Sequence, residues 1–383
     1  MPSVVNVLWT VAICATQTAF AKCYDPSPAF PLPDATVLKR KENFASFDPA
    51  IQYLLSDDKF NTSSFSIEIT SSSETLWSYY HTAPVLNETH GVRQVDGNSR
   101  FRIASITKTF TTLALLHQHA AGNLSLDATI DQYLPELKES QSGSIPWKDI
   151  TLRSLASQLS GIPREITLSD LITELPDPTV VGLPPVSRRN LLECDMYSPE
   201  GVPCEREDLF SRIKERAPLF APNQKSTYSN VAFELLGLAI ANVTGESYDT
   251  VLHRTVLDSI GMMNTTLTKP DDSVGAIPAF SNHWNYNLGI QAPTGALYSS
   301  PSDMSKYLRY VLTHYNGVDH ALNWFQPASW GTGENSFYGS KFSQQVLPMN
   351  TSELYSPLGD LPDFQDPRSD QQAYKIHHKS WRA

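Results

Sequence analysis

Alternating apolar and polar residues predict a β-hairpin early in the chain. Residues 65–69 (FSIEI) and 75–79 (TLWSY) are rich in β-branched and aromatic side chains, and the polar run Ser71–Glu74 separates them. Two such stretches joined by a short polar turn are typical of antiparallel strands. An amphipathic pattern over residues 47–55 predicts a short helix just before this hairpin.

Helical periodicity dominates the middle of the chain. After Ser105, apolar side chains recur at helical spacing and Gly122 is a suitable stop, which predicts a well-buried helix. Its apolar face consists of Ile106, Phe110, Leu113, Leu116 and Ala120. Shorter apolar patterns predict further helices over 152–159, 231–240 and 248–260.

The order of these elements predicts the fold class. A mostly helical region over about 110–285 follows the hairpin, and the pattern returns to strand at Gly295–Tyr298 before a last helix from Pro301. A Pro-rich polar stretch over 175–203 is expected to form a large loop. The element order is therefore a sheet edge, a long and mostly helical body and a return to strand, which suits an α/β protein of the α+β type.

The N-terminus predicts a cleaved secretion signal. Residues 4–20 are mostly apolar and uncharged, and Ala19-Phe20-Ala21 supplies the small-x-small pattern of a signal-peptidase site. No Lys or Arg precedes the run, so a membrane anchor is the alternative, but the run is short for a spanning helix. We interpret residues 1–21 as a signal peptide and expect a secreted protein without membrane contact after cleavage.

Two further features agree with secretion. Six N-x-S/T sequons offer glycosylation sites in a eukaryotic host, at Asn61, Asn87, Asn123, Asn242, Asn264 and Asn350. Cys14 would leave with the signal peptide, whereas Cys194 and Cys204 could close a local disulfide in an oxidising compartment. Cys23 is then either free or paired elsewhere.

Composition narrows the function classes. The chain has 383 residues, of which 40% are hydrophobic and 18% charged, and this suits one large globular domain or two ordinary ones. Because its net charge of −11 leaves no broad basic face, we expect no nucleic-acid partner. No C-x-x-C or H-E-x-x-H spacing occurs, and we predict neither a metal nor another cofactor. The pattern gives no prediction of oligomeric state.

Residues 101–110 (FRIASITKTF) carry the first candidate chemistry. Ser105 and Lys108 stand three residues apart and would share one face of a helix, with the hydroxyl near its N-terminus. This arrangement suits a serine nucleophile beside an amine base, and burial would lower the pKa of Lys108. A serine that only caps a surface helix is the alternative, and a four-residue pattern does not decide between them.

Three segments together resemble the serine β-lactamase-like family, which includes class C β-lactamases, D-Ala-D-Ala carboxypeptidases and related esterases. They are 101–110, 151–163 (TLRSLASQLSGIP) and 228–237 (YSNVAFELLG), and they stand in the order that is typical of this family. Residues 294–304 (TGALYSSPSDM) also resemble its strand-then-helix return.

The resemblance has consequences for domain organisation. It covers about residues 45–340 and implies a β-lactamase/transpeptidase-like domain over 22–340. In that fold an antiparallel sheet is flanked by helices, and a mostly helical second subdomain would span about residues 110–285. The polar, Pro-containing tail over 341–383 does not resemble the family. We interpret this tail as a divergent end or as the product of a truncated reading frame.

The resemblance also assigns roles to four residues. It implies that Ser105 accepts the acyl group, that Lys108 is its base partner, and that Tyr228 and Asn230 belong to the Y-x-N motif. A Ser hydroxyl needs a neighbouring base, and a Lys–Tyr pair can take its proton and return it to the leaving group. Asn230 would orient Lys108 and contact the acyl side chain. The backbone N–H of Ser105 would form half of an oxyanion hole.

The family's third motif, K-T-G or H-x-G on a late strand, is not recognisable. Gly331-Thr332-Gly333 lacks the cation, and Lys379 near the C-terminus lacks the glycine. The missing strand would carry the second oxyanion donor and a cation for a substrate carboxylate.

We therefore expect a secreted serine hydrolase or acyltransferase that acts on a small-molecule ester, lactone or amide through an acyl-enzyme at Ser105. A catalytically impaired relative that only binds a ligand is the alternative, because the third motif is missing. A tailoring role in secondary-metabolite biosynthesis is a further hypothesis, which rests on the resemblance and the secretion signals alone.

Overall fold

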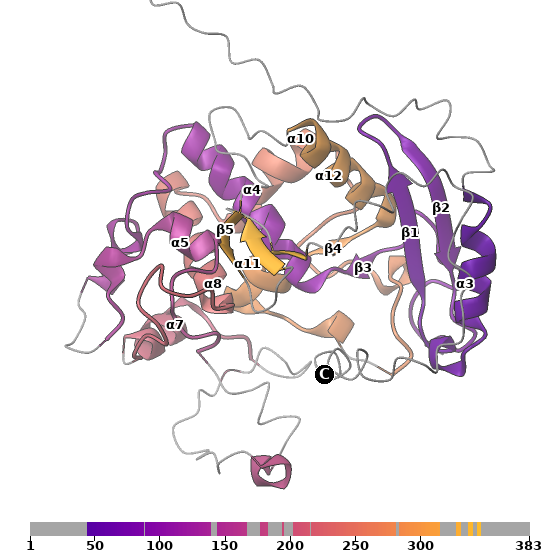
Figure 1. Cartoon of the computed structure of the whole chain (residues 1–383), viewed down its shortest axis with the longest axis horizontal. Coiled ribbons are helices and arrows are strands. Elements are labelled where there is room, and N and C mark those ends of the chain that lie inside the picture. The colour runs from indigo at the N-terminus through magenta and orange to yellow at the C-terminus, as the bar shows by residue number, and fades with distance from the viewer. Residues whose placement is uncertain are drawn as a thin grey trace, which may run out of the picture. The chain divides into compact units, whose positions relative to one another are not determined.

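The computed structural model describes residues 44–87, 89–138, 144–166, 177–182, 194, 202–214, 216–280, 283–314, 327–330, 336–339 and 343–345. All of them belong to one compact unit that spans residues 35–383 (Figure 1). The predicted signal peptide, Cys23 and Asn350 lie outside the described residues.

The predicted first helix and hairpin are confirmed. Helix α3 (Phe47–Leu55) precedes strands β1 (Phe65–Thr70) and β2 (Thr75–His81), which pair in antiparallel fashion. The ring of Phe47 lies edge-to-face against that of Trp77 in β2, with ring centres 5.4 Å apart. This aromatic contact holds the helix beside the hairpin, where Figure 1 also shows it.

Helix α12 (Pro301–Thr313) packs against the same hairpin. Glu68 of β1 accepts hydrogen bonds from Ser305 Oγ at 2.5 Å and from Tyr80 OH at 2.6 Å. The contact between Glu68 and Ser305 joins segments that are 237 positions apart in sequence. It therefore fixes the late part of the chain on the early strands.

The helical body consists of α4 (Thr107–Ala120), α5 (Leu152–Ala156), α7 (Arg206–Ile213), α8 (Asn230–Thr244) and α9 (Tyr248–Leu252). A π-helical turn, His253–Leu257, continues α9 into α10 (Asp258–Ile260). Helices α4 and α8 pack together, and fully buried side chains such as Phe110, Leu113 and Leu235 form the main core. Each such side chain contributes roughly 1.5–3 kcal/mol by its burial.

Local sequence determines where two of the helices end. Gly122 adopts a φ of +75° and donates its N–H to His119 O at 3.0 Å, which confirms it as the stop after α4. Helix α5, in contrast, ends at Ala156, earlier than the predicted range 152–159, and Gln158 has a φ of +58°. A left-handed residue at this position is incompatible with continuing the helix.

The strand predicted at Gly295–Tyr298 is correct only at its end. Pro293 lies in the first turn of a short helix, α11 (Ala292–Gly295), where its fixed φ and missing N–H are tolerated. The strand itself is β4 (Tyr298–Ser299), and it pairs in antiparallel fashion with β3 (Phe101–Arg102). The late strand and the segment before Ser105 are therefore direct neighbours.

A third antiparallel sheet has the strand order β5 (Pro327–Trp330), β6 (Ser336–Gly339) and β7 (Ser343–Gln345). Strand β7 lies within the segment that the sequence suggested as a divergent tail. Residues 331–333 and Lys379, considered above for the third motif, lie outside the described residues. Helices with three small antiparallel sheets confirm the α+β class.

The predicted disulfide between Cys194 and Cys204 is present, with Cα atoms 4.9 Å apart. Asp208 offers an oxygen within 4.8 Å of both sulfur atoms, but sulfurs bonded to each other are not thiolate ligands for a metal. Most of the predicted loop over 175–203 lies outside the described residues, and a 3₁₀ turn at Pro178–Val181 is described within it.

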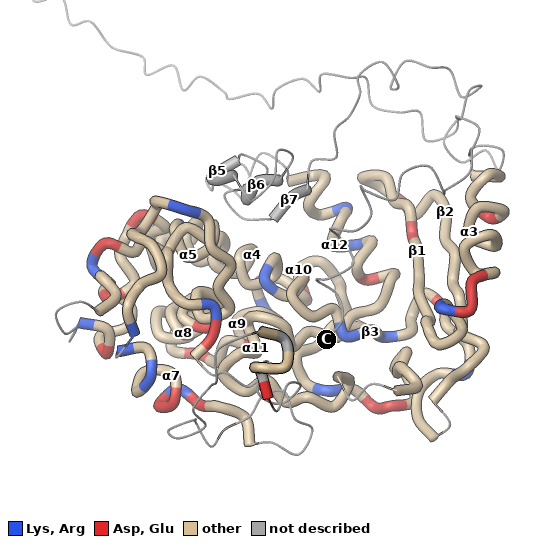
Figure 2. The backbone as a smooth tube through the Cα atoms, turned by 60° about the horizontal axis from the view of Figure 1, so that its bottom comes forward, with Lys and Arg blue, Asp and Glu red and all other residues tan. Residues whose placement is uncertain are grey.

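Charge and hydropathy are unremarkable along the part of the chain that the structure describes. None of its helices combines the length and the apolar character that a bilayer-spanning segment needs. Acidic and basic residues are interspersed along the backbone (Figure 2).

Candidate active site

Ser105 lies on a tight turn between β3 and α4. The 3₁₀ turn Ala104–Ile106 precedes the first residue of α4, and Ser105 is exposed in it. Ala104 has a φ of +43°, a conformation that costs an L residue on the order of 1–3 kcal/mol. A hydrogen bond of 2.9 Å from Ile103 N–H to Leu297 O ties the turn to the residue before β4. Neighbouring backbone therefore holds Ser105 in a strained, outward-facing turn.

Lys108 lies in the first turn of α4 and is almost completely buried, with 6% of its surface exposed. Its Nζ is 3.2 Å from Ser105 Oγ and donates to the carbonyl oxygen of Thr294 in α11 at 2.9 Å. The ring centres of Tyr228 and of Phe233 in α8 lie 4.9 and 5.7 Å from the same nitrogen. Groups from α4, α8 and α11 thus enclose the amine.

Burial changes the acid–base chemistry of this amine. Desolvation, helped by the nearby Arg164 guanidinium, lowers the pKa of Lys108 from 10.5 to about 7. The carboxyl groups of Glu165 and Glu234 act in the opposite direction. A substantial fraction of Lys108 is therefore neutral near pH 7 and able to accept a proton.

Tyr228 reaches the same serine from just before α8. Its hydroxyl donates to Ser105 Oγ at 2.8 Å, although the two residues are 123 positions apart. The guanidinium carbon of Arg164 lies 5.2 Å from the centre of the Tyr228 ring. The structure therefore brings together the three residues predicted to be catalytic, with an amine and a phenol both within hydrogen-bond reach of one hydroxyl.

The segment after α5 holds the Tyr228 turn in place. Gln158 Oε1 accepts the N–H of Ser229 at 2.7 Å, and Ser229 Oγ donates to Pro163 O at 2.7 Å. Ser229 also caps α8 by accepting the N–H of Ala232 at 3.1 Å. One serine is thus fixed by its backbone and by its side chain, which explains how its neighbour Tyr228 reaches Ser105.

Asn230 contacts a residue that was not predicted as part of the site. Its amide nitrogen donates to Glu165 Oε1, and its Oδ1 has no hydrogen-bond partner among the described residues. The described hydrogen bonds of Asn230 do not include one to Lys108, and its contact with the acyl side chain stays a prediction. Asn230 is the first residue of α8, so its short side chain lies over the segment after α5, beside Glu165.

Two buried carboxyl groups lie behind Lys108, and neither was predicted as part of the site. Glu165 Oε2 accepts from Gln291 Nε2 at 2.8 Å. Glu234, in α8, is fully buried, and its oxygens have no hydrogen bond of normal geometry among the described residues, although the nearby Gln291 side chain acts to lower its pKa. Burial, and then the charge of Glu165, raise the pKa of Glu234 from 4.5 to about 8, so it is protonated at neutral pH. In the sequence, its only signal was a single charge inside the apolar run 231–240.

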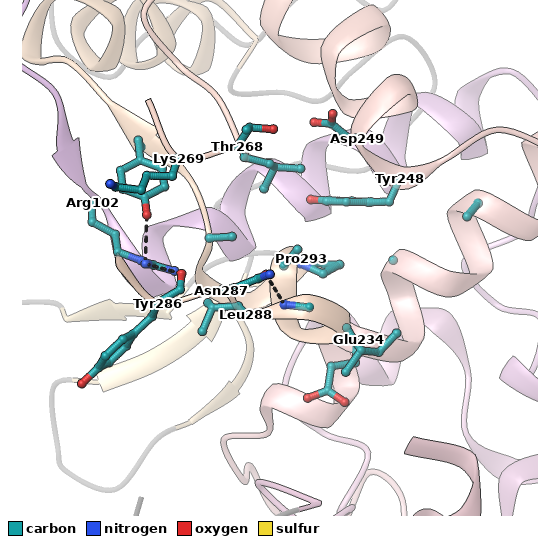
Figure 3. A pocket seen from close by; sticks show the side chains of 18 of the residues that line it. Arg102, Glu234, Tyr248, Asp249, Thr268, Lys269, Tyr286, Asn287, Leu288 and Pro293 are labelled. Atoms are coloured by element: carbon teal, nitrogen blue, oxygen red, sulfur yellow. Dashed lines mark hydrogen bonds between the residues drawn. The ribbon is translucent and has the colours of Figure 1, made fainter. Parts of the chain in front are cut away.

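A cavity of about 710 Å³ shares α8 and α11 with this site (Figure 3). Arg102 at its wall donates to Tyr286 O at 2.8 Å and to Tyr298 OH at 3.0 Å. The carboxyl group of Glu234 is turned away from Tyr248, which lines the same cavity (Figure 3). Ser105, Lys108 and Tyr228 are not among its lining residues.

Helix α11 separates the cavity from the amine. Pro293 of this helix lines the cavity and contacts α8 so closely that a Cβ on Gly237 would lie 2.3 Å from its Cγ. The next residue, Thr294, receives the hydrogen bond from Lys108. The cavity is therefore distinct from the surface on which Ser105 is exposed.

Replacing Glu234 by Gln tests its protonation state. With a folded pKa of about 8 against an ordinary 4.5, its contribution to stability is complete below pH 4.5 and is lost as the pH rises through 8. Glu234→Gln removes this loss, so its free energy of unfolding should gain on that of wild type between pH 5 and pH 8, by on the order of a few kcal/mol, and its melting temperature should rise relative to wild type over the same range. Glu246→Gln, an exposed replacement of the same kind, controls for net charge. If the stability difference between Glu234→Gln and wild type stays constant from pH 5 to pH 8, Glu234 does not have a raised pKa.

Comparisons with known proteins agree with this geometry. The family described as beta-lactamase matches residues 72–339. The probable hydrolase M10 of Phoma sp. is 29% identical over 87% of this chain and 55% of its own length. The probable hydrolase clz13 of Cochliobolus lunatus is 29% identical over 87% of this chain and 56% of its own. A beta-lactamase-like protein of Arthroderma benhamiae is 30% identical over 94% of this chain and 64% of its own length. The chain thus spans little more than half the length of the first two relatives.

Solved structures show the same architecture. A D-stereospecific amidohydrolase from Streptomyces sp. superposes with a TM-score of 0.57 at 20% identity, over 82% of this chain and 84% of its own. A class C beta-lactamase gives a TM-score of 0.57 at 20% identity, over 84% of this chain and 78% of its own. These likenesses confirm the predicted β-lactamase/transpeptidase-like fold. Together with the family match over residues 72–339, they show that the chain belongs to the beta-lactamase family.

Proposed function

We propose that the protein is a serine hydrolase or acyltransferase that acts on a small-molecule ester, lactone or amide through an acyl-enzyme at Ser105. One observation carries this proposal: Ser105 Oγ lies 3.2 Å from Lys108 Nζ and 2.8 Å from the Tyr228 hydroxyl. A serine hydroxyl becomes a useful nucleophile when a neighbouring base takes its proton, and these distances are within the range for such transfer.

The proposed reaction has two halves. Ser105 Oγ attacks the substrate carbonyl and passes its proton to the Lys108–Tyr228 pair, while the backbone N–H of Ser105 stabilises the oxyanion. The carbon–leaving-group bond then breaks, and the pair returns the proton to the leaving group through Tyr228. Water or a second nucleophile attacks the acyl-enzyme by the reverse route. Lys108 and Tyr228 act as one coupled acid–base unit in both halves.

The alternative is a relative that binds the ligand without turnover. It rests on the third motif, which is not recognisable in this sequence, since a second oxyanion donor contributes roughly 10²–10³-fold in rate in a serine hydrolase. The two hypotheses make opposite predictions for a substitution at Ser105.

Ser105→Ala separates enzyme from binding protein. We expect a fluorophosphonate probe to label Ser105 in the folded protein and the alanine variant to lose both labelling and ester turnover, by on the order of 10⁴-fold or more. Peptide mapping and an activated-ester panel measure the two effects. Ser302→Ala, which removes a serine at the start of α12, is the control and should retain both. Absence of labelling, together with equal turnover by wild type and S105A, would favour the binding protein.

The pH dependence tests Lys108. Because desolvation lowers its pKa to about 7, the proton-accepting neutral amine becomes available as the pH rises through 7, well below the ordinary 10.5. A profile of kcat/KM for a neutral ester should therefore rise with an acidic limb near pH 7 and reach a plateau. Lys108→Ala should remove the limb together with most of the activity, and a rise that begins only near pH 10 would contradict the assignment.

We further propose secretion and glycosylation, which residues 1–21 and the sequons support. Expressed in a eukaryotic secretion host, the mature protein should begin at Lys22 and carry a glycan at Asn123, which is exposed just after α4. Asn264 should remain unmodified, because it is only partly exposed and its side chain is held at both ends: it donates to Asn98 at 3.3 Å and accepts from Arg100 at 3.2 Å, whereas the exposed Asn123 only donates, to Gln118 at 2.7 Å. N-terminal sequencing and glycopeptide mapping test this. Retention of residues 1–21 or a glycan at Asn264 would count against it.

A tailoring role in secondary-metabolite biosynthesis is a narrower proposal for the same chemistry. It rests on the resemblance to acyl-transferring family members and on the secretion signals. Co-localisation and co-expression of the gene with biosynthetic genes would support it, and an isolated, constitutively expressed gene would speak against it.

A further inference from the structure

Glu165 lies between the segments that enclose Lys108. Its Oε1 accepts from the Asn230 amide at the start of α8, and its Oε2 accepts from Gln291 Nε2 at 2.8 Å. Gln291 ends the 3₁₀ turn Gly289–Gln291, which leads directly into α11. The carboxyl group is 8% exposed. It therefore connects the segment after α5 with both helices that pack on the amine.

A chain of hydrogen bonds leads from Glu165 to the amine. Gln291 O accepts from Thr294 Oγ1 at 2.7 Å, and Thr294 O accepts from Lys108 Nζ at 2.9 Å. Gln291 and Thr294 lie three residues apart in one continuous helical segment. A shift of the Gln291 side chain would therefore disturb the Thr294 carbonyl that holds Lys108. The position of the amine relative to Ser105 thus depends on Glu165 through Gln291.

The chemistry of these bonds favours a charged Glu165. Both of its oxygens accept N–H groups, and such hydrogen bonds stabilise a carboxylate. The Arg164 guanidinium, whose Nε lies 3.7 Å from Glu165 Oε1, adds a cation at the solvent side. The second buried carboxyl, Glu234, is protonated and leaves Glu165 as the anion of the pair.

We propose that Glu165 is a positioning residue for Lys108, holding the walls of its compartment through Asn230 and Gln291 and placing a buried negative charge beside the amine. The proposal rests on the function proposed above, in which Lys108 shares the proton of Ser105. Glu165 is itself too buried to contact substrate, and it acts only through Lys108.

The charges around Lys108 change its pKa in known directions. Glu165 and Arg164 lie on the segment after α5, Glu234 on α8, and Tyr228 just before α8, whereas α11 offers the uncharged carbonyl of Thr294. Glu165 raises the pKa of Lys108 and Arg164 lowers it. Removing each charge in turn should therefore move the titration of Lys108 in opposite directions.

The test compares Glu165→Gln with Arg164→Gln in the full chain. Both variants are made in a Glu234→Gln background, because removing the charge of Glu165 would lower the pKa of Glu234 and let it ionise in place of Glu165. Glu165→Gln keeps the shape of the side chain and removes its charge, so the acidic limb of kcat/KM should move to lower pH, by about one pH unit. Arg164→Gln should move the same limb to higher pH. Arg254→Gln, a charge removal on the exposed side of the helical body, is the matched control and should leave the limb in place.

A purely structural role would lower activity without moving the limb, and this result for Glu165→Gln, or a shift to higher pH, overturns the proposal. If Glu165→Gln folds poorly, Glu165→Asp, which keeps the charge on a shorter side chain, should restore the wild-type limb at reduced kcat.

A second readout does not need turnover. The ¹³Cε shift of labelled Lys108 against pH, measured in a Ser105→Ala background, should show the same opposite displacements in the two variants. Wild-type protein without turnover or labelling would refute the proposed function, while opposite displacements in this titration would still support the role of Glu165. Identical titrations in both variants would refute it even in an active enzyme.

Discussion

The desolvated amine of Lys108 is the constraint on which the rest of the site depends. An ammonium group taken out of water is costly unless it is paired, and here the cost appears as a pKa lowered to about 7. The amine is kept in place by the carbonyl of Thr294 and by the start of α4, whose core face is fully buried. The same burial that anchors the helix therefore makes its lysine a base.

The two carboxyl groups behind the amine follow from the same constraint. Two carboxylates in one dry region repel each other, and the hydrogen-bonding environment decides which one keeps the charge. Glu165 has amide donors on both oxygens, whereas Glu234 is fully buried and stays protonated near neutral pH, because burial outweighs the opposing effect of the Gln291 side chain on its pKa. The site therefore holds one carboxylate, Glu165, beside one partly protonated amine, Lys108. The charge of Lys108 thus depends on a buried group that does not contact the substrate.

The sequence was sufficient where contacts are local and insufficient where they are not. Ser105 and Lys108 meet because residues three apart share a helix face, and Gly122 ends that helix through its own left-handed conformation. Tyr228 was found only through a family resemblance, because no local rule connects it to a serine 123 positions away.

The misses have physical reasons as well. Glu165 and Gln291 pair across 126 positions, and polar loop residues of this kind carry no periodic signal. Where a strand was predicted at Gly295–Tyr298, the structure has the end of helix α11 and then the start of β4. The sequence does not distinguish the two, because an apolar run with a proline fits either the first turn of a helix or the approach to a strand. Asn230 matched its motif by position, yet a carboxylate on a neighbouring loop, not the lysine, binds its amide.

The described hydrogen bonds of the nucleophile come from parts of the fold other than the late strand on which the third motif would lie. The hydrogen bonds that place Ser105, Lys108 and Tyr228 come from α4, from the residues before α8 and from α11, and the strained turn at Ala104 is tied to Leu297 beside β4. A chain can retain a preorganised nucleophile while its rate depends on which groups complete the oxyanion hole, because preorganised donors stabilise charge only where it develops.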